Sequence, residues 1–459
     1  MRIVVMLPLS LLLLSAPAQP AKVVIIGLDG VSLNLLEPYA EAGVTPNLKK
    51  LMEQGARGHL EAFWPTRTPQ VWTSAVTGKL PGQHGIWDHL SNTWYSPPDV
   101  RTKNKRVVTV RDRKSKALWN LLDAKGLKSL VVGWVVTHPA EKLEHGAIVA
   151  PVELMGDRRQ TTIKGSFYRG ARQGTVQPES LWPEVSELIV DPSDITAAEL
   201  KPYADVPPPT SALYKLPRLK GYMYTYKWSL ARARTVEKIT LGLLDDVKPD
   251  VVFSYFQCTD TMGHRFWSFK EPEEYTSQRL GELGLPAKYA AELKERFGGA
   301  FEACYRDSDE RLGRILEATA GPDTLVVILS DHGFGHGERP HPFKSEPYGG
   351  VHLDQGIIIA VGPGIPGGTT IEGASVLDIT PTVLHYLGQP VADDMCGKVI
   401  DNLFDYDRVR LSKRPVERIP TYEAKAQTVC PYPDGYPPRS IPLRPTSEQM
   451  NGRNPYEKN

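Results

Sequence analysis

Apolar positions along the chain form either short unbroken runs or longer segments with a helical period. Runs of β-branched and apolar residues at 22–28, 250–256 and 324–330 are typical of central strands buried on both faces of a parallel sheet. Weaker patterns predict strands at 58–63, 128–136 and 356–361, and helices at 34–42, 45–52, 115–125, 229–247, 289–320 and 380–387. This alternation predicts an α/β fold with a doubly wound, mostly parallel central sheet and helices on both faces.

The pattern changes at positions that suggest the domain organisation. Residues 1–18 combine a basic start, an apolar run and an A-x-A sequence, which predicts a cleaved secretory signal peptide; an uncleaved anchor is the alternative, although the run is short for a membrane span. Residues 19–405 are expected to form one domain with insertions at about 91–113 and 146–226. Residues 406–459 are expected to form an irregular tail.

Composition narrows the range of partners. The formal net charge is +1 and no basic run occurs, so no nucleic-acid-binding surface is evident. No segment after the signal sequence is long enough to span a bilayer.

Export would allow one or two disulfides with three possible full pairings, while Cys258 could equally be a buried free thiol. The four cysteines are Cys258, Cys304, Cys396 and Cys430.

Acidic and histidine residues follow the three central runs. These are Asp29 after the first run, Asp260 and His264 after the second, Asp331 and His332 after the third, and His352 before the strand at 356. Open α/β sheets bind ligands at the carboxyl ends of their strands. Each residue alone could serve a turn or a helix cap, but a mixed set of aspartates and histidines suits Zn²⁺, and six ligands can form two sets of three.

The stretch from 64 to 78 offers a hydroxyl that could act as a nucleophile. Pro69 is placed at the first helical position, so Thr68 is expected at the N-cap. A capping threonine is the simpler interpretation. With two metal ions nearby, however, a hydroxyl could attack a phosphate ester, whose charge the metals would neutralise.

The ordered motifs resemble the alkaline phosphatase superfamily, and within it the type I phosphodiesterase/nucleotide pyrophosphatase branch, from residue 23 to about 403. The motifs are Gly27-Leu-Asp29-Gly30, Pro65-Thr-Arg-Thr68, Trp72-Thr-Ser-x-x-Thr-Gly78, Pro81-x-x-His-Gly-Ile86, Asp260-x-x-x-His264 and Ser330-Asp-His-Gly333. The resemblance implies that one zinc is held by Asp260, His264 and His352. It assigns the other zinc to Asp29, Asp331 and His332, with Thr68 as the nucleophile bound to it. His84 matches a motif position that is not a ligand.

Several alternatives remain open within this resemblance. Branch members that cleave nucleotides usually have an Asn downstream of the nucleophile, and residues 69–72 contain none. The Cys/Ser-x-Pro-x-Arg sequence of sulfatases is also missing around all four cysteines. His336 and His341 compete with His352 as the last ligand. His352 is favoured because the family's last histidine precedes a strand.

The expected protein is a secreted or periplasmic two-zinc phosphohydrolase that forms a covalent phospho-threonine. Its expected partner is a small-molecule phosphate ester, with nucleotide-like esters as one option and phosphodiesters favoured over monoesters. One alternative is a phosphomonoesterase in which Arg67, or a basic residue of the insertion, clamps the additional charge. Another is a secreted, metal-stabilised binding protein with a decayed site.

Overall fold

The computed structural model describes residues 22–63, 66–91, 106–151, 174–207, 210–211, 213, 217–272, 276–277, 280–281, 286–335, 350–405, 415–424 and 430. The predicted signal peptide and the two competing histidines, His336 and His341, lie outside the described residues.

A nine-stranded sheet crosses the molecule, in the order β11-β2-β10-β7-β1-β6-β3-β4-β5. The central strands β7, β1, β6, β3 and β4 run parallel to one another. Only β10 and the edge strand β5 pair antiparallel with their neighbours in this sheet, so the prediction of a mostly parallel sheet is confirmed for the part of the chain described. The strands are β1 (Val23–Leu28), β2 (Ala56–Glu61), β3 (Ser129–Val132), β4 (Ala147–Val149), β5 (Val176–Gln177), β6 (Val251–Phe256), β7 (Leu325–Leu329), β10 (Gln355–Val361) and β11 (Thr369–Ser375).

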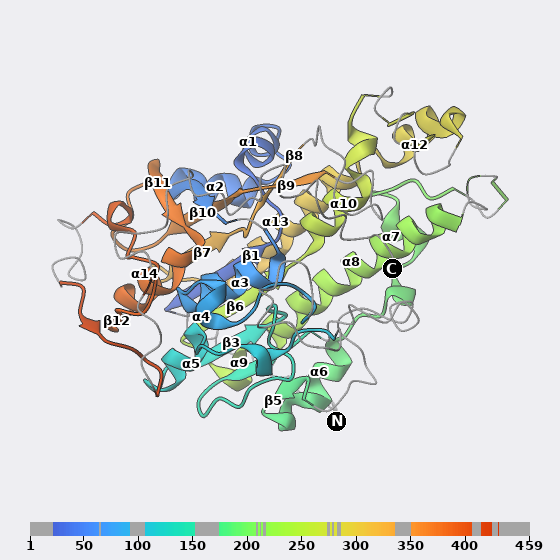
Figure 1. The fold of residues 1–459 in the computed structure, drawn as a ribbon. Helices are drawn as coiled ribbons and strands as arrows, with labels where there is room; N and C mark the ends of the chain where they lie inside the picture. The colour runs from blue at the N-terminus through green and yellow to red at the C-terminus, as the bar shows by residue number, and fades with distance from the viewer. Residues whose placement is uncertain are drawn as a thin grey trace, which may run out of the picture.

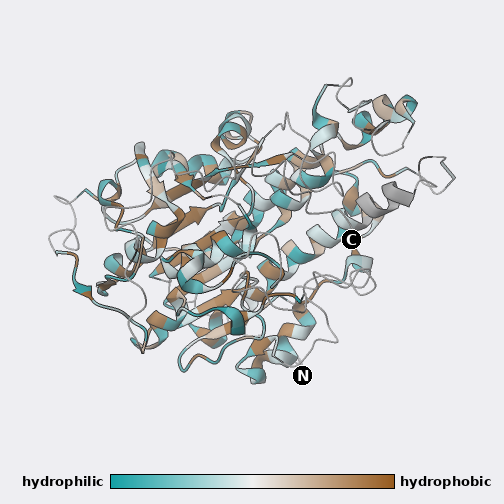
Figure 2. Cartoon of the chain, viewed as in Figure 1, coloured by the Kyte–Doolittle hydropathy of each residue, from teal (hydrophilic) through white to brown (hydrophobic). Residues whose placement is uncertain are grey.

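Helices cover both faces of this sheet because alternate strand residues point to opposite sides. In β1, Val24 and Ile26 belong to one hydrophobic core, and Val23 and Ile25 belong to the other. The first core is closed by α1 (Leu33–Glu41), α2 (Pro46–Gln54), α8 (Pro217–Gly242), α10 (Cys258–Lys270) and α13 (Ala300–Thr319). The second is closed by α3 (Thr68–Thr77), α5 (Leu118–Asp123) and α14 (Ile379–Tyr386). The doubly wound arrangement is therefore confirmed (Figure 1), and Figure 2 shows the apolar strands at its centre.

Some elements differ from the sequence prediction. The strand predicted at 128–136 ends at Val132, because Gly133 and Val136 adopt positive φ angles of 71° and 58° and turn the chain. The segment predicted as an insertion at 146–226 includes β4 and β5, which extend the sheet, and the first residues of α8. It also contains α6 (Trp182–Leu188) and α7 (Ala197–Leu200), which contribute to the first core. Strands of two and three residues are too short to show a period.

Two disulfides fix the cysteine pairing that the sequence left open. Cys258 at the start of α10 is joined to Cys304 on α13, and Cys396 is joined to Cys430. The second bond ties the carboxyl-terminal part of the chain to the body. That part also contributes β13 (Arg418–Ile419), which pairs with β12 (Val391–Ala392). Among the residues described, no helix combines the length and apolar character required to cross a membrane.

Gly27 marks a tight contact between the sheet and α3. A Cβ atom at this position would lie 2.7 Å from Trp72 Cη2 and 3.2 Å from Tyr255 Cδ2. Trp72 is fully buried on α3, so its ring cannot move out into solvent. We predict that Gly27→Ala lowers the free energy of unfolding by about 1–3 kcal/mol, measured by urea denaturation, because overpacking displaces rigid neighbours.

The matched control is Gly82→Ala on α4 (Pro81–His84), where an added Cβ meets no atom within 4 Å. Its stability should change by less than that of the first variant, and by about 0.5 kcal/mol at most. Equal effects of the two substitutions would show that the contact with Trp72 is not tight.

Candidate metal centre

The candidate ligands converge at the carboxyl ends of three adjacent strands. Asp29 follows β1, and Asp331 and His332 follow β7, which pairs with β1. On its other side β1 pairs with β6, after which α10 begins at Cys258. Asp260 and His264 are four residues apart on α10 and therefore share one face of that helix. The structure therefore brings the candidate ligands together at the sheet edge where the sequence predicted them.

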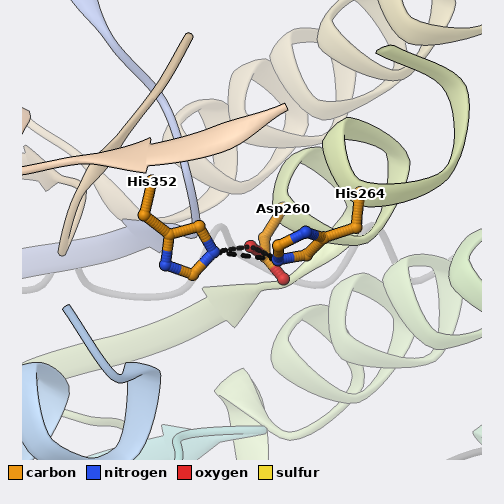
Figure 3. Close-up of side chains that lie close together, drawn as sticks. All are labelled: Asp260, His264 and His352. Atoms are coloured by element: carbon orange, nitrogen blue, oxygen red, sulfur yellow. Dashed lines mark hydrogen bonds and ion pairs between the residues drawn. The ribbon is translucent and has the colours of Figure 1, made fainter. Parts of the chain in front are cut away.

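The first cluster consists of Asp260, His264 and His352, the last on β9 (Val351–Leu353). Asp260 Oδ1 lies 3.2 Å from Nε2 of each histidine, and the two Nε2 atoms are 2.8 Å apart. Figure 3 shows the three side chains pointing toward one another from a helix and a strand. The structure thus brings together the residues that the sequence analysis assigned to one ion.

The second cluster surrounds His332, which is fully buried. Its Nε2 lies 3.3 Å from Asp29 Oδ1, 3.5 Å from Asp331 Oδ2 and 3.8 Å from Asp260 Oδ1. The predicted second set is therefore also assembled. Asp260 stands within reach of both clusters, since ligand atoms of Asp29, Asp260 and His332 all lie within 4.8 Å of one another. The sequence could not indicate this shared position.

Backbone carbonyl groups hold the far side of two of the histidine ligands, His352 and His332. His352 Nδ1 lies 2.9 Å from the carbonyl oxygen of Thr66, and His332 Nδ1 lies 3.0 Å from the carbonyl oxygen of Gly333. A carbonyl oxygen can only accept, so both histidines carry their proton on Nδ1 and present an unprotonated Nε2 to the cluster.

The carboxylates are oriented in the same manner. The Tyr255 hydroxyl donates to Asp29 Oδ2, and the amide of Gly30 donates to Asp331 Oδ1 over 3.4 Å. The opposite oxygens, Asp29 Oδ1 and Asp331 Oδ2, point to His332. One atom of each carboxylate is thus anchored and the other is directed into the centre.

The inward-facing atoms lack hydrogen-bond partners among the described residues. These buried atoms are Asp29 Oδ1, Asp260 Oδ1, Asp331 Oδ2 and His332 Nε2. Buried polar atoms without partners are costly and are rare in native proteins, unless an ion or another group satisfies them. Carboxylate oxygens and neutral imidazole nitrogens are ligands for divalent metal ions such as Zn²⁺. The donor set therefore fits metal binding.

The electrostatics support the same conclusion. Burial and the charge of Asp29 raise the pKa of Asp331 well above its usual range. Burial opposes the charged form of Asp260 as well, but His264 and His352 outweigh it and hold the pKa of Asp260 well below normal. Burial lowers the pKa of His352 to about 3, which favours the neutral imidazole that binds metals. Within the described residues, no lysine or arginine forms an ion pair with these carboxylates.

Thr68 lies at the start of α3 and is buried. Arg67 has extended backbone angles and its carbonyl accepts from Val71 N at 3.0 Å, so Arg67 is the N-cap and Thr68 is the first helical residue. The predicted N-cap position is therefore wrong by one residue. Among the described residues, the Thr68 hydroxyl forms no hydrogen bond. The carbonyl of Thr66, two residues earlier, does contact His352 and brings this segment against the first cluster.

Two other residues of the sequence analysis have roles away from the ligands. Arg67 binds Asp88 through two contacts, Nε–Oδ1 at 2.9 Å and Nη2–Oδ2 at 3.2 Å, which occupy one side of its guanidinium group. A phosphate clamp on that same side of the guanidinium group would require breaking the pair. His84 is fully buried with Nε2 2.9 Å from Ser74 Oγ, in line with a structural role.

Residues that orient Asp29 were missed by the sequence analysis. Tyr255 and Thr259 both reach it, Tyr255 through the carboxylate and Thr259 through the backbone carbonyl. The only signal for Tyr255 was a tyrosine within a strand predicted to be buried, because a buried tyrosine normally finds a partner for its hydroxyl.

Comparison with a family model identifies the family of this chain. The model for type I phosphodiesterase / nucleotide pyrophosphatase matches residues 23–363. The chain belongs to this family. The matched range includes all of the candidate ligands and Thr68, and the resemblance inferred from the motifs is confirmed. By its name the family comprises hydrolases of phosphoester and pyrophosphate bonds, which supports the predicted enzyme class.

Similarity to individual proteins is more limited. The chain is 30% identical over 92 residues to a 2,3-bisphosphoglycerate-independent phosphoglycerate mutase of Chromohalobacter salexigens, a match that covers 20% of this chain and 17% of the mutase. A mutase of the same description from Roseobacter denitrificans is 29% identical over 101 residues, covering 22% of this chain and 19% of that protein. The chain thus matches about a fifth of the length of these curated relatives. Among solved structures, a putative sulfatase from Bacteroides thetaiotaomicron is similar with a TM-score of 0.48 and 13% identity, over 84% of this chain and 74% of that one.

The hydroxyl of Tyr255 provides a direct test of the metal centre. We predict that Tyr255→Phe lowers metal affinity on the order of 10- to 100-fold, because loss of a group that orients a ligand has this effect at other metal sites. Metal affinity is measured by competition with a chelator, and unfolding should remain cooperative. The control is Tyr386→Phe, whose hydroxyl bonds the carbonyl of Asp323 away from the centre. Equal metal affinity in all three proteins would refute the orienting role of Tyr255.

Proposed function

We propose that this protein is an exported two-zinc phosphohydrolase that cleaves small-molecule phosphodiesters through a covalent phospho-threonine. The observation that carries the proposal is the pair of adjacent Asp/His clusters whose inward atoms lack hydrogen-bond partners. The first zinc would be held by Asp260, His264 and His352. The second would be held by Asp29, Asp331 and His332, beside the segment that carries Thr68.

The reaction is proposed to begin with attack by Thr68. Its hydroxyl oxygen forms a bond to phosphorus while the bond from phosphorus to the departing alcohol oxygen breaks, and the hydroxyl proton ends on the released alcohol. Water then cleaves the threonine–phosphate bond and restores the hydroxyl. When bound, the metal ions would supply the positive charge that stabilises the transferring phosphoryl group.

The residues of the chain would contribute orientation and charge. The start of α3 places Thr68 where the helix dipole favours a negatively charged group. Thr66 and Tyr255 keep His352 and Asp29 in the orientation that exposes their ligand atoms. Burial of Thr68, the three aspartates and His332 limits access of bulk water.

Specific observations weigh against two alternative functions. A phosphomonoesterase would need a cationic group for the additional charge of a monoester, and Arg67 is engaged by Asp88. A binding protein with a decayed site would be expected to have lost ligands, whereas all six are assembled. A phosphodiesterase therefore has more support. Export is proposed from the sequence pattern of residues 1–18 and agrees with the two disulfides.

Metal content tests the foundation of this proposal. We predict about two zinc ions per mature chain by elemental analysis, and loss of hydrolysis after chelation, because each cluster offers three ligands. Asp260→Ala should lower the occupancy further than Asp331→Ala, because Asp260 lies within reach of both clusters. Active protein without a transition metal would refute the two-zinc assignment.

Substitution of Thr68 tests the covalent step. We predict that Thr68→Ala keeps its zinc but loses several orders of magnitude in kcat, as on removal of a covalent nucleophile. Thr68→Ser should retain partial activity because the hydroxyl remains. Acid quenching with a phosphorus-labelled diester should trap the label on the peptide that contains Thr68. The control is Thr66→Ala, which keeps the backbone carbonyl that contacts His352. Full activity of Thr68→Ala without trapped label would exclude the covalent mechanism.

A further inference from the structure

A buried arginine stands at the same edge of the sheet as the metal centre. Helix α8 is fixed to β6 by the pair Thr240 Oγ1 and Ser254 Oγ, 2.9 Å apart. Arg232 precedes Thr240 by eight residues, or roughly 12 Å along the helix. Its Nη1 donates to Gln257 Oε1, and Gln257 is the residue between β6 and α10. The Arg232 side chain therefore reaches the carboxyl end of β6, close to the start of α10, the helix that carries Asp260 of the first cluster.

Aromatic rings hold the guanidinium group in place. Its central carbon lies 5.5 Å from the ring centroid of Tyr255 and 5.6 Å from that of Trp228. The hydroxyl of Tyr255 binds Asp29, so this one tyrosine contacts the guanidinium group through its ring and the second cluster through its hydroxyl. Arg232 is thus linked to the metal centre through Tyr255.

The free atoms of this guanidinium group have a specific geometry. Nε and Nη2 are buried and have no hydrogen-bond partner among the described residues, while Arg232 as a whole is 6% exposed. Nε and Nη2 form one side of the guanidinium fork, the side that can bind both oxygens of a carboxylate or phosphate. A buried, permanently charged donor pair is costly without a partner. An anion is the partner that matches this charge and geometry.

We propose that Nε and Nη2 of Arg232 bind an anionic group of the substrate adjacent to the scissile phosphate. This inference rests on the proposed function and identifies its substrate class as phosphodiesters with a carboxylate beside the reacting phosphorus. Tyr255 connects the two positions, because its ring contacts Arg232 and its hydroxyl binds Asp29 of the second cluster. Arg232 is a specificity-determining residue in this scheme.

The kinetic test uses two esters with the same leaving group. Ethyl 4-nitrophenyl phosphate and carboxymethyl 4-nitrophenyl phosphate differ chiefly in the carboxylate, and zinc-loaded wild-type enzyme should prefer the second. Arg232→Gln should reduce the ratio of their kcat/KM values on the order of 10- to 100-fold, the range for a lost charge-assisted hydrogen-bond pair. Arg232→Lys should give a smaller reduction, since it keeps the charge but loses the fork.

A binding test decides the inference even if neither ester is hydrolysed, in which case the proposed function fails by itself. Calorimetry compares propylphosphonate with 2-carboxyethylphosphonate, which carries a carboxylate in place of the terminal methyl group. Wild-type protein should bind the carboxylate probe more tightly, and Arg232→Gln should lose that difference.

The matched control is Arg234→Gln on the same helix, where the arginine is paired with Glu199 at 2.6 Å. Its preference between the paired probes should equal that of the wild type. Zinc content and the unfolding midpoint of each variant show whether folding is intact. The inference is overturned if Arg232→Gln leaves both preferences unchanged, or if it selectively impairs the monoester 4-nitrophenyl phosphate, because the fork would then serve the reacting phosphoryl group.

Discussion

The central constraint on this structure is the burial of three carboxylates, Asp29, Asp260 and Asp331, without a lysine or arginine among the described residues to pair with them. Burial, together with repulsion from the like charge of Asp29, raises the pKa of Asp331 well above its usual range. The fold tolerates the arrangement because cations can complete it. A site that binds cations accounts for the histidines, for the tyrosine that orients Asp29 and for the position of α3.

The sheet explains how these carboxylates come so close together. In the parallel strands β1, β6 and β7 the carboxyl ends meet at one edge, and apolar packing on both faces prevents the strands from spreading. Close contacts such as that between Gly27 and Trp72 hold α3 against the same strands. Burial of apolar residues in the two cores thus stabilises the fold that holds the charged residues close together.

The sequence contained enough information for the main strands and for the convergence of the ligands. The apolar runs before Asp29 and Asp331 are long and unbroken, so strand position and the end that carries the ligand could both be predicted. The strands β4 and β5 were missed because they are too short for a pattern. The helix start at Thr68 was misplaced by one residue because the extended conformation of Arg67 depends on its surroundings.

Features that depend on contacts between distant segments were beyond sequence reasoning. The shared position of Asp260 and the place of Arg232 beside Tyr255 arise from packing among α8, α10 and β6.

The wide separation of the ligands along the chain has a consequence for biosynthesis. Gly30 and Asp331 are hydrogen-bonded across 301 positions, and His352 is required to close the first cluster. Contacts of such long range form late, because the intervening chain must first be ordered. On the ribosome, Asp29 emerges long before its partners, and a growing chain that ends before residue 352 cannot assemble the complete ligand set. Metal binding by the proposed ligand sets would therefore come at the end of folding, after most of the chain has been translated.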